Sequence, residues 1–306
     1  MSKQKAQAIA GKLDLWKYAE DKKPQIETAL REHLPFAPVH IETRFNEAVE
    51  YALFSGGKRL RPVLTLLGAE LVGGTSDLIV PSAVAVEFIH TSSLIFDDLP
   101  CMDDSNERRG KTSLHEKFGE GLAVLVGIGF LNAAYNLVFL NHKHSPELAI
   151  QAHSEIVECV GAAGMVGGQS VDLALAKGAT SNDFSSEDYK FESVRNLKTS
   201  ALMRLALCVG AILAGANHLE LKNLSRFARI LGDAYQLSDD LLDLEEDYKI
   251  FQSNKPFAVN KGQDAAQLKL KTITEEAKQV LIENFPPNEA RGCLIQFTDY
   301  LAERKN

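Results

Sequence analysis

The sequence has 306 residues, of which 45% are hydrophobic and 24% are charged, with a formal net charge of -8. These values are those of an ordinary globular protein, and the acidic balance counts against a nucleic-acid-binding protein. No change of composition marks a linker, so residues 1–306 are interpreted as a single domain, although the length alone is compatible with two.

Four cysteines are spread through the chain, at Cys101, Cys159, Cys208 and Cys293, and none forms a C-x-x-C pair. A zinc site and a disulfide framework are both disfavoured, because each needs closer or more numerous cysteines. Residues 1–15 are polar, contain no apolar run and are not rich in arginine and serine, so they resemble neither a signal peptide nor a transit peptide. We expect reduced thiols and a cytoplasmic location.

Helical periodicity dominates the sequence. Apolar residues recur three or four positions apart almost everywhere, and long alternating β-branched segments are absent. We therefore predict an all-α protein with breaks at Gly56-Gly57, Gly73-Gly74 and Pro286-Pro287. The predicted helices cover residues 24–33, 41–55, 60–73, 79–98, 115–140, 146–175, 187–194, 197–216, 219–246, 264–284 and 288–303.

The first segment with chemical character is GGKRLRP at residues 56–62. It places Lys58 and Arg61 three positions apart at a predicted helix start, where free backbone N–H groups and the helix dipole also attract anions. These features predict a phosphate-binding site. Arg59, in contrast, is interpreted as part of a solvent-exposed basic surface.

An acidic cluster, DDLPCMDD, occupies residues 97–104 and follows an apolar helical run. Pro100 cannot donate a helical hydrogen bond, so the helix should end or bulge here and allow Asp97 and Asp103 to converge. Anions at a helix C-terminus are disfavoured by the dipole, which indicates that a metal ion compensates them. His90 lies two turns before Asp97 on the same face, and we expect it to be a ligand rather than a core residue.

The segment from residue 121 to residue 141 carries no charged residue and is long enough to cross a bilayer, which takes about 20 apolar residues. Asn132, Tyr135 and Asn136 interrupt it, and no other segment resembles a membrane span. We expect a buried central helix rather than a span.

A second acidic cluster lies near the end of the predicted helix 219–246. Asp239 and Asp243 are four residues apart and share a face, which Gln236 extends by one turn. A solvated acidic face is the alternative, but the flanking residues are apolar, including Leu241 and Leu242. Mg²⁺ suits such a face, because it binds a few carboxylates together with waters and substrate phosphates.

The combination of motifs resembles the trans-prenyl diphosphate synthases, which include the farnesyl and geranylgeranyl diphosphate synthases. The matching motifs, in order, are GGKRLRP (56–62), DDLPCMDD (97–104), RRG (108–110), GGQ (167–169), KT (198–199) and YQLSDDLLD (235–243). The resemblance implies an all-α isoprenoid-synthase fold around a central cavity, a homodimer, and a magnesium-dependent prenyltransferase with three ions when substrate is bound. It also implies that isopentenyl diphosphate condenses with dimethylallyl, geranyl or farnesyl diphosphate.

The resemblance further assigns roles to single residues. The Mg²⁺ ligands would be Asp97, Asp98, Asp103, Asp239 and Asp243. The contacts to the allylic substrate would be Arg108, Lys198, Thr199 and Gln236, with Lys255 reaching it from a mobile loop. The isopentenyl diphosphate pocket would be formed by Gly57, Lys58, Arg61, His90 and Arg109.

Two departures from the family pattern are present. We expect them to affect closure of the site and the catalytic rate more than the type of reaction. Residues 245–254 form a shorter loop than usual and lack a Gly-Lys pair, and Ile128 stands where the family usually has aspartate. Two rival functions are a terpene cyclase and a non-catalytic partner subunit. The first needs an Asn/Asp–Ser/Thr–Glu metal motif that the sequence lacks, and the second would show degenerate acidic clusters.

Product length is predicted from the helix that precedes Asp97. In the family, an aromatic residue about one turn before this aspartate tends to stop growth at fifteen carbons, whereas Ser92 and Ser93 stand here. Phe88 is nine residues before Asp97, roughly 13 Å along a helix, and is predicted to be the floor of the tunnel. The main product is therefore predicted to be geranylgeranyl diphosphate, with farnesyl diphosphate as the alternative.

Overall fold

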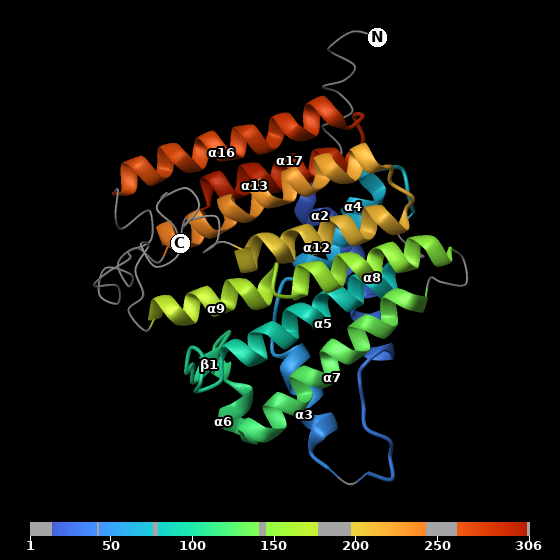
Figure 1. Cartoon of the computed structure of the whole chain (residues 1–306), viewed down its shortest axis with the longest axis vertical. Helices are drawn as coiled ribbons and strands as arrows, with labels where there is room; N and C mark the ends of the chain where they lie inside the picture. The colour runs from blue at the N-terminus through green and yellow to red at the C-terminus, as the bar shows by residue number, and fades with distance from the viewer. Residues whose placement is uncertain are drawn as a thin grey trace.

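The computed structural model describes residues 14–41, 43–75, 79–140, 145–176, 197–242 and 262–304, and these are almost entirely helical (Figure 1). A hairpin of two two-residue strands is the exception in this part of the chain. The all-α prediction is confirmed. The elements are α2 (Leu15–Glu32), α3 (Phe45–Phe54), α4 (Leu60–Leu71), α5 (Val80–Asp97), β1 (Glu107–Arg108), β2 (Lys111–Thr112), α6 (Leu114–Phe118), α7 (Glu120–Phe139), α8 (Pro146–Val160), α9 (Met165–Ala176), α12 (Leu197–Leu213), α13 (His218–Leu242), α16 (Gln263–Asn284) and α17 (Glu289–Glu303).

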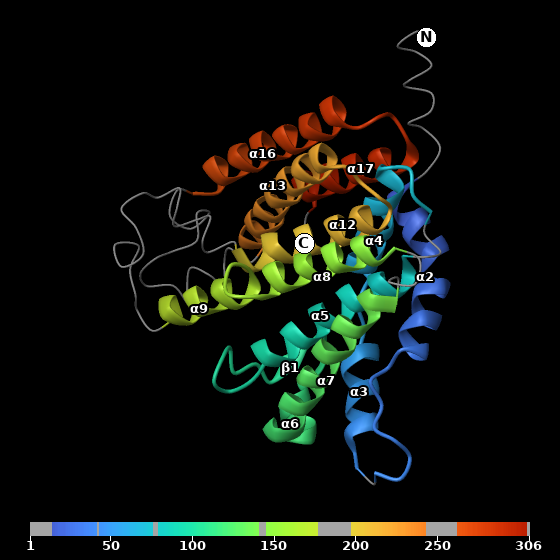
Figure 2. The same ribbon diagram turned by 45° about the vertical axis from the view of Figure 1, so that its right-hand side comes forward.

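Helix α5 lies in the middle of the molecule, because it contacts α2, α3, α4, α7 and α12. Figure 2 shows α12, α13, α16 and α17 on one side of it and α7 on the other, with α2 and α3 at the edge away from α9. Helix α12 packs against α4, α8 and α13. The C-terminal ends of α5 and α13 and the N-terminal end of α12 lie toward the same side of the molecule (Figures 1 and 2).

Close packing of α4 on α12 depends on two glycines. A β-carbon at Gly68 would lie 2.2 Å from the carbonyl oxygen of Leu207, and one at Gly210 would lie 1.9 Å from that of Thr65. Only glycine allows the two backbones to approach so closely. This contact fixes the position of α4, whose first residues are candidate site residues, relative to α12.

The structure divides two of the predicted helices. The predicted helix 115–140 breaks at Gly119, which has a φ of 88° and separates α6 from α7. The predicted helix 146–175 breaks between α8 and α9, where a β-carbon at Gly164 would lie 1.9 Å from the carbonyl oxygen of Cys159. Both breaks lie at glycines inside apolar periodic segments, where the hydrophobic pattern continues across the break.

The first of the predicted helices begins earlier than expected. Helix α2 starts at Leu15 instead of residue 24, because the Asp14 side chain caps it by accepting a hydrogen bond from the Trp16 backbone at 3.0 Å. Pro24 lies inside this helix rather than at its start. The predicted helix 187–194 falls outside the described residues.

Helix α7 is less buried than predicted. By length and composition it is apolar enough to cross a membrane, yet it packs against α3, α5, α6 and α8. Its other face is exposed, with Leu125 57% and Ile128 52% accessible. The prediction of a buried central helix is therefore wrong for this exposed face, and Ile128, which replaces the usual aspartate, lies on it.

Candidate active site

The first acidic cluster lies where α5 ends and the chain folds back on itself. Asp97 is the last helical residue, and its carbonyl oxygen accepts a hydrogen bond from the backbone of Asp103 at 2.9 Å. Asp104 takes a left-handed conformation with a φ of 50°. The loop therefore returns Asp103 to the helix end, as predicted for a segment that contains Pro100.

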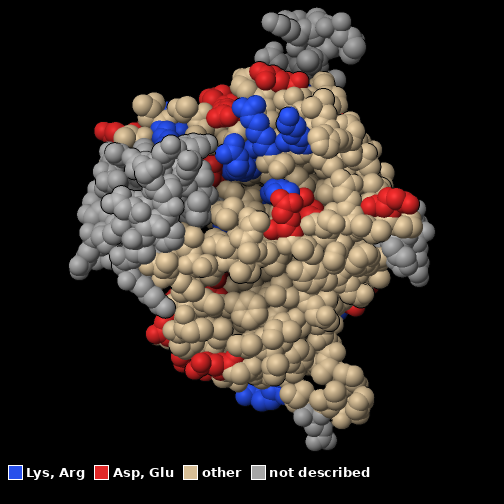
Figure 3. All heavy atoms as spheres, viewed as in Figure 1, with Lys and Arg blue, Asp and Glu red and all other residues tan. Residues whose placement is uncertain are grey.

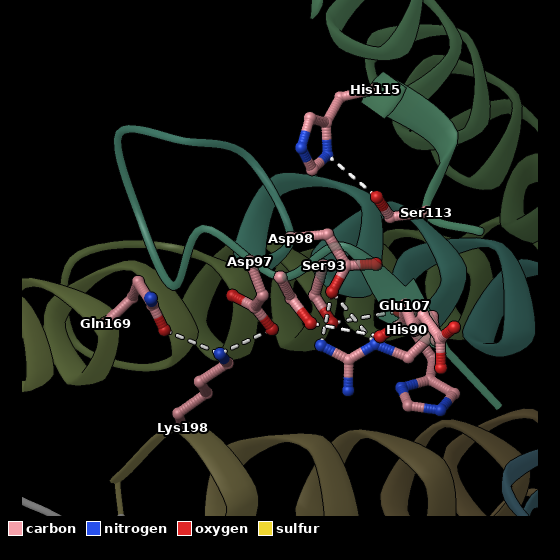
Figure 4. Close-up of polar contacts among 11 residues, drawn as sticks. His90, Ser93, Asp97, Asp98, Glu107, Ser113, His115, Gln169 and Lys198 are labelled. Carbon is pink, nitrogen blue, oxygen red and sulfur yellow. Dashed lines mark hydrogen bonds and ion pairs between the residues drawn. The ribbon is translucent and has the colours of Figure 1, made fainter. Parts of the chain in front are cut away.

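Each aspartate of the helix end is paired with a cation. Lys198 Nζ lies 2.6 Å from Asp97 Oδ2 and donates to Gln169 Oε1 at 2.5 Å, as Figure 4 shows. Arg108 Nε donates to Asp98 Oδ1 at 2.9 Å. Burial raises the pKa of Asp97, and the Lys198 ammonium opposes this shift. Lys198 and Arg108 are thus brought to the first acidic cluster.

The second cluster lies on α13 and is linked to the start of α12. Gln236 accepts a hydrogen bond from the Thr199 hydroxyl at 3.1 Å and donates to Asp240 Oδ1 at 3.1 Å. Asp239 Oδ1 lies 2.5 Å from Arg304 Nη2. Thr199 and Gln236, both predicted site residues, therefore contact each other. The predicted residues Asp243 and Lys255, and the short loop 245–254, lie outside the described residues.

The donor atoms of the two clusters are carboxylate oxygens, which are the ligands that Mg²⁺ takes in proteins. Among the described residues, no three His, Cys, Asp or Glu side chains already form a closed metal site. Mg²⁺ usually keeps several waters and shares substrate phosphates rather than occupying an all-protein cage. Asp97, Asp103 and Asp239 therefore fit a metal that is bound together with a phosphorylated substrate.

A basic pocket of about 580 Å³ also borders α5, with Glu87 and His90 in its lining. Helix α4 begins beside it with no side-chain cap, which leaves its first N–H groups available to an anion. Burial and the nearby Arg61 and Arg109 lower the pKa of His90 well below its usual value, and His90 Nδ1 has no hydrogen-bond partner among the described residues. The lining residues are Trp16, Ser55, Gly56, Gly57, Lys58, Arg59, Leu60, Arg61, Glu87, His90, Arg109, Tyr235, Phe297, Tyr300 and Arg304.

An apolar pocket of about 350 Å³ begins at Asp97 and Lys198. Ser92 and Ser93 line it, as predicted, and Ser92 donates a hydrogen bond to the carbonyl of Gly127 at 3.0 Å. The remaining lining residues are Ile89, Phe96, Met102, Leu131, Val160, Met165, Val166, Gln169, Ser170 and Leu173.

Phe88 does not form the floor of this pocket. It is fully buried, and its ring packs against that of Phe130 at a centroid distance of 5.0 Å, away from the pocket lining. Ile89, the next residue, lines the pocket instead. Ile89 follows Phe88 by one residue, so its side chain points about 100° away from that of Phe88 around the helix axis. An estimate of depth along the axis does not include this rotation.

The interpretation of Arg59 as a solvent-exposed residue is wrong. Only 4% of it is accessible, and it forms ion pairs with Glu27 and Glu87 at 2.8 and 3.0 Å. Three further residues of the site had no role assigned from the sequence. Gln169 belonged to a matching motif, whereas no pattern singled out Trp16 near the N-terminus or Arg304 near the C-terminus.

Together the two pockets can hold two anionic groups and one apolar chain. The basic pocket offers Lys58, Arg61 and Arg109 to one polyanion, and the acidic clusters offer carboxylates to metal ions that bind another. The apolar pocket extends from that second position.

A sequence model of the family described as polyprenyl synthetase matches residues 42–284. The chain belongs to the polyprenyl synthetase family. The predicted resemblance is thereby confirmed, and the match includes all the residues that line the apolar pocket and most of those that line the basic pocket.

Several members of this family are similar over nearly the whole chain. Geranylgeranyl pyrophosphate synthase 11 of Arabidopsis thaliana is 39% identical, with 96% of this chain and 83% of that protein covered. The geranylgeranyl diphosphate synthase of Cyanophora paradoxa is 34% identical, with 96% and 97% covered. The crystal structure of an FPP/GFPP synthase from Zymomonas mobilis has a TM-score of 0.82 at 30% identity and covers 94% of this chain and 99% of that one.

Proposed function

We propose that this chain is a short-chain trans-prenyl diphosphate synthase that condenses isopentenyl diphosphate with an allylic diphosphate and makes mainly geranylgeranyl diphosphate. One observation carries the proposal: α5 lines two pockets, a basic one that includes His90 and an apolar one that includes Asp97. A head-to-tail condensation needs two neighbouring sites of these kinds, because one substrate is held by its diphosphate, the other also extends an apolar chain, and their reacting carbons must meet. Family membership supports the same reaction.

The metal requirement follows from the carboxylates. Asp97, Asp103 and Asp239 would hold Mg²⁺, and we propose three ions when substrate is bound. When bound, Mg²⁺ neutralises the charge that grows on the leaving diphosphate. Lys198 and Arg108 add fixed positive charge beside it, in a partly buried site where charge has a larger effect than in water.

The proposed reaction transfers one prenyl group. The allylic C–O bond breaks, the double bond of isopentenyl diphosphate forms a new C–C bond to the allylic carbon, and the released diphosphate accepts the proton that is lost. The Thr199 hydroxyl and the Gln236 amide, which contact each other, would stabilise the positive charge of the allylic group. Lys58, Arg61 and Arg109 orient isopentenyl diphosphate, and neutral His90 can donate to it without adding charge.

The product proposal rests on the apolar pocket. Ser92 and Ser93 leave the first turn beyond Asp97 open, and Ile89, eight residues from Asp97, lies about 12 Å further along the helix. This depth, together with the names of the relatives, supports a twenty-carbon product over a fifteen-carbon one.

The test is to incubate the purified protein and Mg²⁺ with isopentenyl diphosphate and, separately, dimethylallyl, geranyl or farnesyl diphosphate, and to measure product size. We expect a twenty-carbon diphosphate from each primer. Products that stop at fifteen carbons would contradict the product proposal, and no condensation with any primer would contradict the reaction.

We also propose a homodimer, formed through the exposed apolar face of α7. Figure 3 shows that the surface around α7 is nearly free of charged side chains, and Leu125 and Ile128 are more than half exposed there. Light scattering after size exclusion should give about twice 33.6 kDa. The double variant Leu125→Glu, Ile128→Glu should be monomeric, whereas Leu268→Glu on α16 should stay dimeric, and a monomeric wild type would contradict the proposal.

We also propose a location and a domain count. All four cysteines are free thiols, which suits a reducing compartment, and we propose the cytoplasm. One hydrophobic cluster includes residues from Leu15 to Leu301, which supports a single domain over residues 1–306. Fractionation of cells and limited proteolysis test the two proposals.

A further inference from the structure

The lining of the basic pocket includes a buried arginine, Arg59, whose hydrogen-bonding groups are already occupied. All three guanidinium nitrogens of Arg59 are engaged: Nε donates to Glu27 at 2.8 Å, Nη1 to Glu87 at 3.0 Å and to the Gly56 carbonyl at 3.3 Å, and Nη2 to the Leu53 carbonyl at 2.8 Å. Lys58 and Arg61, its neighbours in the motif, line the pocket beside it.

The loop that Arg59 holds has an unusual backbone. Gly56 and Gly57 have φ values of 123° and 120°, and Arg59 itself is left-handed with a φ of 52°. A non-glycine residue adopts this conformation only where its surroundings stabilise it. Because the Arg59 side chain returns to the carbonyls of Leu53 and Gly56, it closes the loop across the glycine pair.

The same loop orients a second cation of the pocket. Arg109 Nη1 donates to the Gly56 carbonyl at 2.6 Å, so this oxygen accepts from both arginines. A β-carbon on Gly57 would lie 2.6 Å from Arg109 Nη1 and 3.3 Å from Arg59 Nη1. The two guanidinium groups therefore flank Gly57, and the buried carboxylate of Glu87 offsets their charge.

We propose that Arg59, held by Glu27 of α2 and Glu87 of α5, is a positioning residue for the isopentenyl diphosphate pocket, which it serves without contacting substrate. The inference rests on the proposed function for the identity of the diphosphate. It makes the N-terminal helix α2 part of the substrate-binding apparatus. Lysine cannot replace Arg59, because a single ammonium group cannot reach acceptors that lie on different sides of the planar guanidinium group.

The test compares Arg59→Lys with Arg204→Lys. Arg204 is a matched control, because it also pairs with two carboxylates, Glu155 and Glu158, but lies between α8 and α12 away from both pockets. Arg59→Lys should raise KM for isopentenyl diphosphate about tenfold or more and leave KM for geranyl diphosphate within twofold. Arg204→Lys should leave both KM values unchanged, even where it lowers the melting temperature.

A second readout needs no turnover. Trp16 is the only tryptophan and lines the basic pocket, so its fluorescence reports the binding of inorganic pyrophosphate. Arg59→Lys should need about tenfold more pyrophosphate for half of the signal change, and Glu27→Gln, which keeps the hydrogen-bond acceptor, about threefold more.

Unchanged binding in Arg59→Lys, or equal weakening of both substrates, would overturn the inference. If Arg59→Lys does not fold, Glu27→Gln decides it by the same criteria. If the wild type binds pyrophosphate but condenses no prenyl substrates, the proposed function fails, while the positioning of an anion pocket by Arg59 is still tested.

Discussion

The two pockets beside α5 are built in different ways. In the basic pocket, Gly57, Lys58 and Arg61 come from one short segment, and a strained loop fixes their direction. The apolar pocket is lined by residues of α5, α7, α8 and α9 that are far apart in the sequence. Part of the cation set for a diphosphate can therefore come from a local motif, although His90, Arg109 and Arg304 reach the basic pocket from distant segments. The room for a growing chain depends entirely on how several helices pack.

The largest expected effect is a loss of turnover without a loss of anion binding in the basic pocket. Asp97→Ala or Asp239→Ala should lower kcat by about 10³-fold or more, because a metal ligand is lost while core packing is kept. Pyrophosphate binding in the basic pocket, followed by Trp16 fluorescence, should persist in Asp97→Ala. Asp239→Ala is less informative for this readout, because Asp239 pairs with Arg304, which lines the basic pocket. Glu276→Ala on the surface of α16 is the control, and near-normal turnover in either aspartate variant would contradict the two-cluster mechanism.

The next experiment tests whether the pockets bind different substrates. Lys58→Ala should raise KM for isopentenyl diphosphate, and Lys198→Ala should act mainly on the allylic substrate. Loss of one charge-assisted contact costs about 1.5–3 kcal/mol, or roughly 10- to 150-fold. Steady-state kinetics with each substrate varied in turn gives both values. Equal effects of the two variants on one substrate would show that the division into two pockets is wrong.

A third experiment changes only the apolar pocket. Ser93→Phe should shorten the main product by five carbons, because the ring fills the first turn beyond Asp97, and it should change KM for isopentenyl diphosphate less than threefold. Product chromatography measures the result, with Ser93→Ala as the control. Ser92→Tyr is a less informative change, since Ser92 is fully buried and bonds to Gly127 between α5 and α7. Unchanged product length in Ser93→Phe would disprove the tunnel argument.

The smallest expected effect concerns stability at acid pH. Burial and nearby arginines lower the pKa of His90 in the folded state, so the unfolded chain binds its proton first as the pH falls. Its contribution to stability is present above the unfolded pKa of about 6.5 and is lost below it, by up to about 2 kcal/mol at pH 5. His90→Gln should lose less stability than wild type between pH 7 and pH 5 in urea titrations. An equal loss in both proteins would mean that His90 does not sense pH.

The sequence by itself determined the family, the helical class and most of the polar residues of the site. The motifs at residues 56–62 and 97–104 could be interpreted locally. An anion site at a helix start and a helix end bent by proline each need only residues that are neighbours in the sequence. The positions of Lys58, Asp97 and Asp103 followed from such rules.

Tertiary structure alone decided which residues meet across the fold. Arg59 resembled its exposed neighbours until Glu27 and Glu87 were placed against it, and Arg304 reaches Asp239 from 65 residues away. Ile89 lines the apolar pocket instead of Phe88 because of how α5 is rotated about its axis where it packs against α7. Helix α5 is buried on several sides, so its apolar pattern does not specify this rotation. Long-range pairing and helix rotation depend on the packing of whole elements, so neither can be read from a local pattern.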